Sequence, residues 1–216
     1  MYLKILIILI FSLSFIINLS SNDFSFDSLN WTYYKKSNDM DLFINRENKE
    51  INAYRVKKTL FNLNGEELVK NIMNFENYSD IFPKTKKFKL IKEIDKNCYL
   101  MYSIINFHPL KDRDYYIILN YDKVENNGQV IHTISWHPIT ENYKAFFDNK
   151  TKENERVFFI NGRWQIVEYE DGKLTISAEM YNNWKINVSK SIMESFEKQN
   201  AFDMVTNLIG YTFGVK

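Results

Sequence analysis

The stretch GRWQIVEYEDGKLTISAEM, residues 162–180, decides the fold class of this 216-residue chain. On each side of Asp171-Gly172, apolar and polar side chains alternate. The apolar positions are Trp164 and Ile166 before the turn and Leu174, Ile176, Ala178 and Met180 after it. A period of two is typical of a half-buried strand, and Asp-Gly commonly joins two antiparallel strands. The stretch therefore predicts a β-hairpin with one face toward a core.

Strand patterns extend outward from this hairpin over most of the chain. They cover residues 31–36, 41–46, 51–61, 86–94, 98–107, 113–124, 129–137 and 156–169. A helix is predicted from a cap at Asn64, with Glu67 three residues on, to about Tyr78. A longer one is predicted from about Ser189 to Tyr211. This order predicts an α+β fold in which a curved antiparallel sheet is wrapped around the long C-terminal helix.

The C-terminal helix has an unusually wide apolar arc. One stripe contains Phe202, Val205, Ile209 and Phe213, and an adjacent stripe contains Ala201, Met204 and Leu208. A helix that packs on a solid surface needs a narrower apolar face. We therefore expect this helix to close a hollow, although the same stripes also fit an ordinary filled core.

The first 21 residues differ from the rest of the chain. A single lysine is followed by an apolar run from Ile5 to Leu19, which is shorter than a typical spanning helix. We expect a cleaved export signal or, alternatively, an uncleaved anchor. Residues 22–216 then form one domain that works outside the cytoplasm, in the periplasm or the extracellular space.

Composition excludes several classes of function. The 28 lysines and arginines nearly balance the 27 aspartates and glutamates, which gives no support for a nucleic-acid partner. The single cysteine, Cys98, allows no intramolecular disulfide and no multi-thiolate metal site, and we expect an inert packed thiol. We expect no cofactor and no metal.

Several further motifs appear in a fixed order. They are Trp31, LFINR (42–46), Arg55, FENYSDIFP (75–83), PLKDRDYY (109–116), the hairpin at 162–180 and INVSKSIMESF (186–196). Together they resemble a bacterial-type START lipid-binding domain of the Bet v 1-like, helix-grip (SRPBCC) superfamily, over most of residues 30–210. The resemblance implies an internal hydrophobic cavity, closed by the C-terminal helix and the 107–113 loop. It also implies that a lipid or other hydrophobic small molecule is bound there, with or without transfer.

The inward side chains of the strands and of the last helix are the candidate cavity lining. They are Leu100, Tyr102, Ile104, Arg113, Tyr115, Ile117, Leu119, His132, Ile134, Trp136, Trp164, Ile166, Ile176, Ala178, Met204 and Leu208. The strand 98–107 is apolar on both faces, so only the resemblance selects its inward side. Some family members bury an arginine where this chain has Leu119, which implies a more apolar hollow.

Arg113 has three interpretations. It fixes its loop by pairing with Asp112, Asp114 or a distant carboxylate, it contacts a ligand head group, or it is solvated. A buried guanidinium without a partner is too costly to propose.

Two surface segments also have open interpretations. The five lysines of PKTKKFKLIK (83–92) either contact an anionic membrane transiently or protect a solvated edge strand. In the long 138–155 connection, Phe146 and Phe147 either insert into a membrane, close the cavity mouth or pack within the loop.

The chain contains only three histidines, His108, His132 and His137, and no recognisable catalytic motif. We therefore expect a monomeric binding protein and not an enzyme. One alternative is a helix-grip scaffold with a filled core that binds a protein partner. A less favoured alternative is a cyclase or hydrolase with a histidine–carboxylate pair inside the cavity.

Overall fold

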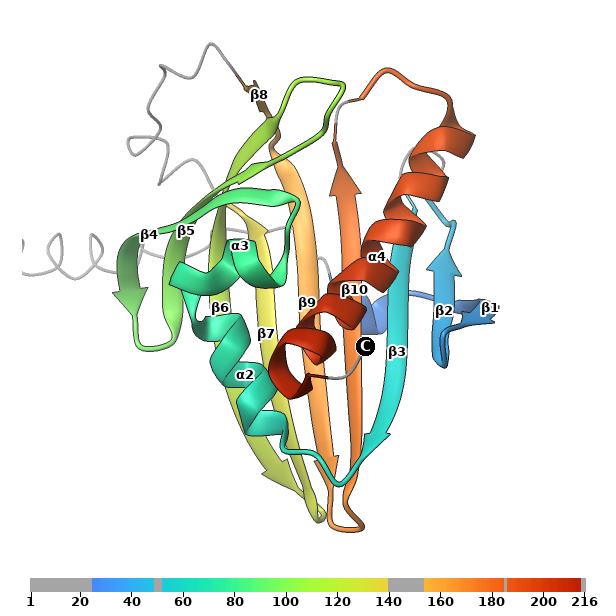
Figure 1. Ribbon diagram of the computed structural model, residues 1–216, viewed down its shortest axis with the longest axis vertical. Helices are drawn as coiled ribbons and strands as arrows, with labels where there is room; N and C mark the ends of the chain where they lie inside the picture. The colour runs from blue at the N-terminus through green and yellow to red at the C-terminus, as the bar shows by residue number, and fades with distance from the viewer. Residues whose placement is uncertain (1–24, 49–51, 140–153, 185, 215–216) are drawn as a thin grey trace, which may run out of the picture.

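The computed structural model describes residues 25–48, 52–139, 154–184 and 186–214, which form a curved sheet with helices on its concave face (Figure 1). The strands are β1 (Thr32–Ser37), β2 (Met40–Asn45), β3 (Ala53–Phe61), β4 (Thr85–Asp95), β5 (Cys98–Ile105), β6 (Arg113–Asn126), β7 (Gln129–Pro138), β8 (Glu155–Arg156), β9 (Phe159–Tyr169) and β10 (Lys173–Asn183). The helices are the 3-10 turns η1 (Phe26–Ser28) and η2 (Phe75–Asn77), with α2 (Gly65–Met73), α3 (Tyr78–Ile81) and α4 (Lys190–Phe213). This architecture confirms the predicted α+β fold.

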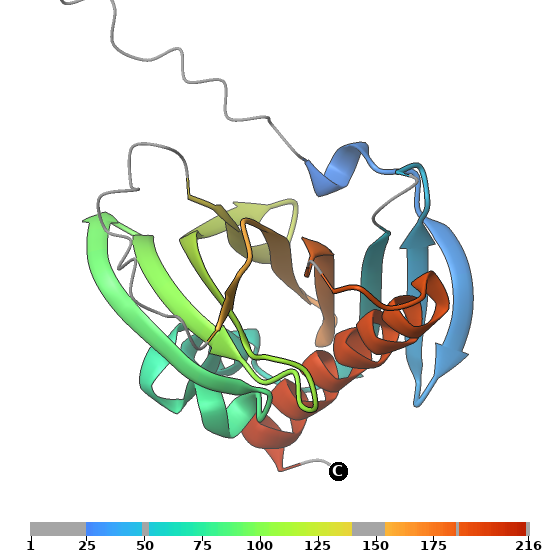
Figure 2. The same cartoon turned by 90° about the horizontal axis from the view of Figure 1, so that it is seen from above.

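The strand order is β1-β2-β3-β10-β9-β7-β6-β5-β4, with β8 paired in parallel to β6 and all other pairs antiparallel. The helices α2 and α3 carry the chain from β3 to the far edge strand β4. From there the chain returns strand by strand until β10 pairs with β3. Seen from above, the sheet curves around α4 (Figure 2).

The hairpin 162–180 forms as predicted, with β9 and β10 joined by a tight turn at Gly172, whose φ is +78°. Trp164 and Ile166 face the core opposite Ala178 and Ile176. Such a turn needs a left-handed residue, which glycine adopts at little cost. The alternation in the sequence therefore correctly predicted which face of these strands meets the main apolar core, although the polar face of β10 is buried as well.

The last helix begins after the predicted start at Ser189 and continues two residues beyond the predicted end at Tyr211. The Ser189 side chain accepts a hydrogen bond from the Ile192 amide, and Gly214 ends α4 in the left-handed conformation. The buried face of α4 contains Glu197, Ala201, Phe202, Val205, Leu208 and Ile209. At its C-terminal end, the Asn71 amide of α2 donates to the Thr212 hydroxyl, so the two helices are joined.

Two predicted elements are divided in the structure. The helix expected from 64 to 78 ends at Met73, because Asn74 leaves the helical region with a ψ of 84°. The strand expected at 156–169 becomes β8 and β9, because the Val157 amide donates to Asp114 of β6 before the chain crosses to β7 and β10. Both breaks redirect the chain without changing the order of elements.

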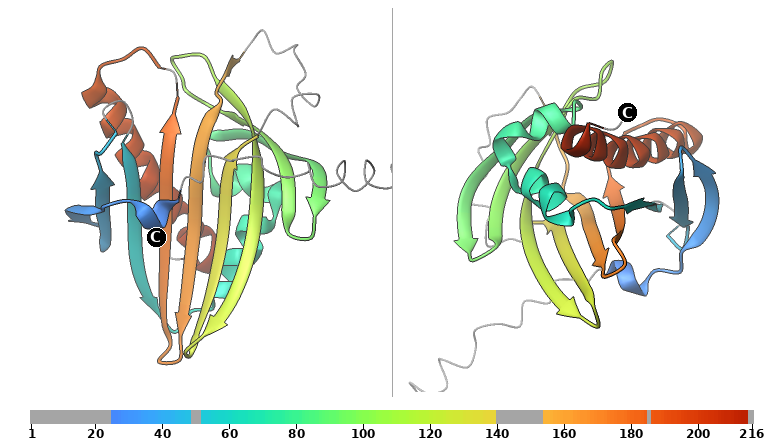
Figure 3. Two further views of the ribbon diagram at one scale, coloured as in Figure 1. Left: turned by 180° about the vertical axis from the view of Figure 1, so that it is seen from behind. Right: turned by 60° about the horizontal axis from the view of Figure 1, so that its bottom comes forward.

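A network of charged side chains holds η1 on the convex face of the sheet (Figure 3). The buried Glu179 carboxylate accepts from Arg55 at 2.6 Å and from Arg163 at 2.7 Å. The same Arg163 donates two hydrogen bonds to Asp27 of η1, and this contact lowers the pKa of Asp27. Each buried charge has opposite partners, which offsets the cost of removing it from water.

Several predictions concern residues outside the described part of the chain. They are the signal or anchor at 1–21 and most of the 138–155 connection with Phe146 and Phe147. Within the described ranges, no helix is both long and apolar enough to span a membrane. Cys98 is half-buried, and burial raises the pKa of its thiol.

Candidate functional site

A pocket of about 360 Å³ lies between the concave face of the sheet and the helices. Its floor is formed by Ile105, Tyr115, Ile117, Leu119, Trp136, Ile160 and Met180. Its roof is formed by Tyr78, Phe82, Pro83, Lys84, Thr85 and Phe88 from α3 and β4, and by Asn200, Asp203, Met204 and Asn207 from α4. Asn182 and Trp184, at and just after the C-terminal end of β10, line the part of the pocket that we call its upper end. Volume and lining are typical of a small-molecule site, which is mostly apolar with a few polar groups.

Five of the candidate lining residues border this pocket. They are Tyr115, Ile117, Leu119, Trp136 and Met204. Tyr115, Ile117 and Leu119 are alternate residues of β6. The face of β6 that was expected to point inward therefore borders the pocket. Leu119 forms part of the pocket floor. By the sequence resemblance, this is the position at which some family members bury an arginine.

Six other candidates lie in the main core, deeper than the pocket wall. They are Ile134, Trp164, Ile166, Ile176, Ala178 and Leu208, all fully buried. They share the correct face of the sheet but are covered by α2, α4 and neighbouring side chains. Alternation along a strand identifies which face of the sheet is turned inward. It does not show which part of that face is covered by packed side chains and which part lines a pocket.

The three candidates on β5 were assigned to the wrong face. Leu100 and Tyr102 pack with Tyr116 and Ile118 in a second apolar cluster, and Ile104 packs against it. The alternate residues of β5 face inward, and one of them lines the pocket. The pattern was ambiguous because this strand is apolar on both faces.

Arg113 does not line the pocket but fixes the loop before β6. Its guanidinium donates to the backbone oxygens of Trp184 and Lys111 and forms an ion pair with Glu155 at 3.2 Å. The first of the three interpretations is therefore correct, with a distant carboxylate as partner. The next residue, Asp114, points the opposite way and pairs with Arg156.

His132 is fully buried near the N-terminus of α2 and not in the pocket. Its Nδ1 lies 3.0 Å from the Tyr121 hydroxyl, and its Nε2 lies 3.2 Å from a Glu168 oxygen. The other Glu168 oxygen accepts from the Gly65 amide at 3.0 Å. A carboxylate at this end of a helix interacts favourably with the helix dipole. This group therefore attaches α2 to the sheet.

The open side of the pocket is bridged by one lysine. The Lys84 ammonium donates to the Asp203 carboxylate at 3.2 Å and to the Asn200 amide oxygen at 3.5 Å. We call these three residues the Lys84 clasp, because they join the α3–β4 turn to α4 at a partly exposed position. The 107–113 loop was expected to close the cavity, but no residue of it lines this pocket.

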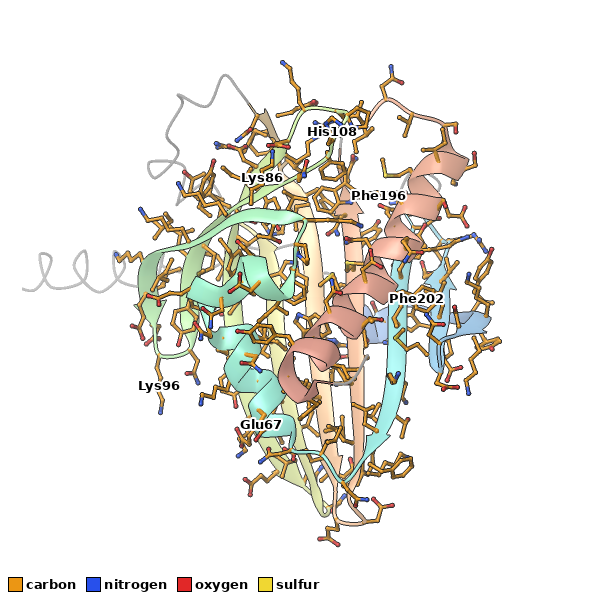
Figure 4. The ribbon with its side chains drawn as sticks, in the orientation of Figure 1. Glu67, Lys86, Lys96, His108, Phe196 and Phe202 are labelled. Carbon is orange, nitrogen blue, oxygen red and sulfur yellow. The ribbon has the colours of Figure 1, made fainter. Side chains whose placement is uncertain are left out.

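That loop instead packs beside the first half of α4. The ring of Phe107 lies 5.0 Å from the rings of both Trp184 and Phe196. In Figure 4, Phe196 projects from α4 below the loop that carries His108. The loop therefore supports α4. The α3–β4 turn lies over the pocket, in the position that was expected for the loop.

A buried carboxyl group in α4 was missed in the sequence. Glu197 is only 8% exposed, is hydrogen-bonded to the Tyr54 hydroxyl, and lies beside Asn182 and Asn200. Burial raises its pKa from 4.5 to about 8. Its position was detectable, because Glu197 precedes Ala201 by four residues and Val205 by eight and so extends the buried stripe.

The described residues contain no cluster of three or more histidine, cysteine, aspartate or glutamate side chains that could hold a metal ion. The Tyr121, His132 and Glu168 group has the residue types of an acid–base relay, but it does not border the pocket. The pocket therefore provides shape and a mostly apolar floor, with polar side chains in its roof and at its upper end.

The raised pKa of Glu197 has a defined effect on stability. Between pH 4.5 and 8, the carboxyl ionises in the unfolded chain while it stays protonated in the folded chain. Stability therefore falls as pH rises, by up to about 1.4 kcal/mol per pH unit. Glu197→Gln cannot ionise, so this variant should lose less stability than the parent between pH 5 and pH 8 in urea unfolding.

The matched control for this test is Glu194→Gln on the same helix. Glu194 pairs with Lys198 and Arg46, and both contacts lower its pKa, so its ionised form stabilises the fold. The control should therefore lose stability relative to the parent at high pH. Identical pH profiles for the parent and Glu197→Gln would refute the proposed protonation state.

No family model and no curated protein sequence matches this chain. Solved structures do resemble it. Human StAR-related lipid transfer protein 5 has a TM-score of 0.70 at 12% identity, with 86% of this chain and 88% of that chain covered. A fragment of the STAR-related lipid transfer protein from Xanthomonas axonopodis has a TM-score of 0.68 at 16% identity, with 84% and 98% covered.

A more distant likeness is to the Zhui aromatase/cyclase of a Streptomyces species. Its TM-score is 0.50 at 11% identity, with 74% of this chain and 93% of that chain covered. The two lipid-transfer proteins match over more of this chain and with higher scores. The chain therefore has the helix-grip fold of START lipid-transfer domains.

Proposed function

We propose that this protein binds a lipid or other hydrophobic small molecule in the pocket beneath α4 and transfers it between membranes without chemical change. The observation that carries the proposal is the pocket of about 360 Å³ with an apolar floor. Burial of a hydrocarbon there contributes roughly 25 cal/mol per Å² before the costs of association. Similarity in fold to proteins named for lipid transfer supports it.

Transfer requires an opening, which we assign to the Lys84 clasp. The α3–β4 turn and α4 are joined there by a partly exposed ion pair, and the same ammonium lies 5.0 Å from the centroid of the Phe196 ring. Exposed ion pairs contribute only about 0.2–1 kcal/mol, so this contact can break at little cost. The clasp therefore gives the ligand a route that leaves the sheet intact.

A membrane contact through β4 is a further part of the proposal. This strand lies at the edge of the sheet, and Figure 4 shows Lys86 and Lys96 toward its two ends. Between them Leu90 and Ile91 are 41% and 36% exposed beside exposed lysines. Apolar side chains flanked by lysines suit an anionic lipid surface. Since we also propose that the protein is exported, we propose that the transfer takes place outside the cytoplasm.

Two other functions have less support. A protein-interaction scaffold with a filled core would not need an apolar pocket of this size. An enzyme would need reactive groups in contact with its substrate, whereas the hydrogen-bonded group around His132 lies at the N-terminus of α2.

The first test is ligand uptake by the fragment 22–216. Purified protein should carry a lipid or sterol-like molecule, or take one up, as detected by native mass spectrometry and extraction. Ile117→Trp fills the pocket floor and should lower uptake of a fluorescent lipid about tenfold or more, since overfilling forces side chains apart. Val124→Trp, at the exposed end of the same strand, is the control and should bind normally. An empty protein without uptake would contradict the proposal.

The second test concerns the clasp. Asp203→Lys places two ammonium groups together and should accelerate lipid exchange between vesicles by about two- to fivefold, as expected for loss of an exposed ion pair. Adding Lys84→Glu to this variant reverses the pair and should restore the original rate. Unchanged exchange in Asp203→Lys would exclude the clasp as the opening, whatever the uptake test shows.

The third test concerns the membrane contact. Replacing Lys89 and Lys92 by glutamate should weaken binding to vesicles that contain anionic lipid by at least tenfold, because each lysine contributes about 1 kcal/mol near such a surface. Reversing Lys36 and Lys57, which are exposed on β1 and β3, is the matched control. Equal losses in the two double variants would indicate a nonspecific effect of net charge and would refute the assigned surface.

A further inference from the structure

A second, polar chamber of about 220 Å³ lies under the N-terminal half of α4. Asn52, Asn182, Trp184 and Glu197 are among the residues that line it. In contrast to the pocket floor, its walls carry side-chain amides and a carboxyl group. This chamber is separate from the Lys84 clasp and has no role in the function proposed above.

One buried acceptor in the chamber has no hydrogen-bond partner among the described residues. The Asn52 amide donates to the Tyr54 hydroxyl at 3.1 Å, and that hydroxyl is hydrogen-bonded to Glu197. The other polar atom of the Asn52 amide, Oδ1, has no hydrogen bond within the described part of the chain, although the residue is only 5% exposed. Buried polar atoms are nearly always paired, so an orphaned oxygen that lines a chamber indicates a missing donor.

The chamber also has a donor next to this acceptor. Burial keeps the Glu197 carboxyl protonated near neutral pH, so its O–H group is available. Among the described residues, the other ionisable groups that border the chamber are Lys190 and Glu194, which carry opposite charges, and Glu194 is already paired with Lys198 and Arg46. The chamber therefore suits a ligand group that both donates and accepts a hydrogen bond and carries no net charge.

The chamber and the apolar pocket are adjacent, because Asn182 and Trp184 line both. Between them lies a gap of about 10 Å³, bordered also by Met180 and Asn200. A space of this size admits about one water molecule. A single ligand that occupies both spaces therefore needs a small polar group and a small outward movement of the side chains at the gap.

We propose that the polar chamber binds the hydroxyl group of an uncharged lipid alcohol whose hydrocarbon part fills the pocket beneath α4. The ligand hydroxyl donates to Oδ1 of Asn52 and accepts from the Glu197 carboxyl. One hydroxyl thus pairs with the unsatisfied acceptor of Asn52 and with the available donor of Glu197, the two ends of the hydrogen-bonded series Asn52, Tyr54 and Glu197. This inference rests on the proposed lipid-binding function and names the class of lipid.

The test compares three ligands of one chain length: dodecanol, its methyl ether and dodecylamine. Each displaces a fluorescent lipid probe from the full chain at pH 7. The alcohol should bind about tenfold more tightly than the ether, because only the alcohol donates a hydrogen bond to the buried oxygen. Asn52→Leu should remove this preference by weakening alcohol binding while ether binding stays within twofold of the parent.

A second pair of variants keeps the test independent of the folding of Asn52→Leu. Glu197→Gln still donates a hydrogen bond and should retain the preference for the alcohol, whereas Glu197→Leu should lose it. Ser195→Ala, on the exposed side of α4, is the control and should behave as the parent.

Three results would overturn the inference. Equal affinity of the parent for alcohol and ether would remove the hydroxyl site while leaving lipid binding intact. Tightest binding of the amine would assign the chamber to an ammonium group instead. Failure of the parent to bind the probe and all three ligands would refute the proposed function together with this inference.

Discussion

The packing of α4 across the concave face of the sheet is the constraint on which the pocket depends. A helix of 24 residues is about 36 Å long, which is enough to cross most of the curved sheet. It packs directly on β3 and β10, where the small side chain of Ala201 and the buried Val205 and Leu208 allow close contact. Over β5, β6 and β7 the helix stands away from the sheet, and α3 with the start of β4 completes the roof. The hollow is therefore a product of curvature, since a flat sheet would meet the same helix along its whole length.

The buried charges of the molecule divide into two groups with different surroundings. Glu179, Asp114 and Arg113 have oppositely charged partners, and they secure η1, β8 and the loop before β6. Glu197 is hydrogen-bonded to a tyrosine hydroxyl, has no oppositely charged partner among the described residues, and is kept neutral by burial. Buried ion pairs in which every charge has a partner hold elements of the fold together. A buried carboxyl that can still donate a hydrogen bond lowers stability and joins no elements, which makes it a candidate for ligand binding. This contrast distinguishes the upper end of the pocket from the rest of the interior.

The sequence predicted the order of elements well, because the strand and helix periods change sharply at Asn64 and Ser189. It predicted the pocket-facing side of β6, whose inward parity is the more apolar of the two, and the core-facing side of the β9–β10 hairpin, where only one parity is strongly apolar. It did not predict the face of β5, where both parities are apolar and tertiary packing alone decides. The break at Asn74 was also missed, since the helical pattern continues through it.

The candidate site was harder to predict than the fold. Alternation along a strand reports which side is buried, and Trp164 and Ile117 obey the same rule although only the latter borders the pocket. The polar residues of the upper end come from β3, β10 and α4, which are far apart in the sequence, so no local pattern joins them. Glu197 resembles one more exposed charged residue of a helix. Only its spacing of four residues from Ala201 indicates that it lies on the buried face.

The charge network around Arg163 determines how the molecule is presented to its surroundings. It fixes η1 on the convex face, so the described chain begins on the side opposite α4 and the Lys84 clasp (Figure 3). If the N-terminus remained tethered to a bilayer, that bilayer would lie behind the sheet, and the mouth of the pocket would point away from it. Such an orientation suits delivery across a gap to an opposing acceptor, and it disfavours extraction of lipid from the bilayer that holds the tether.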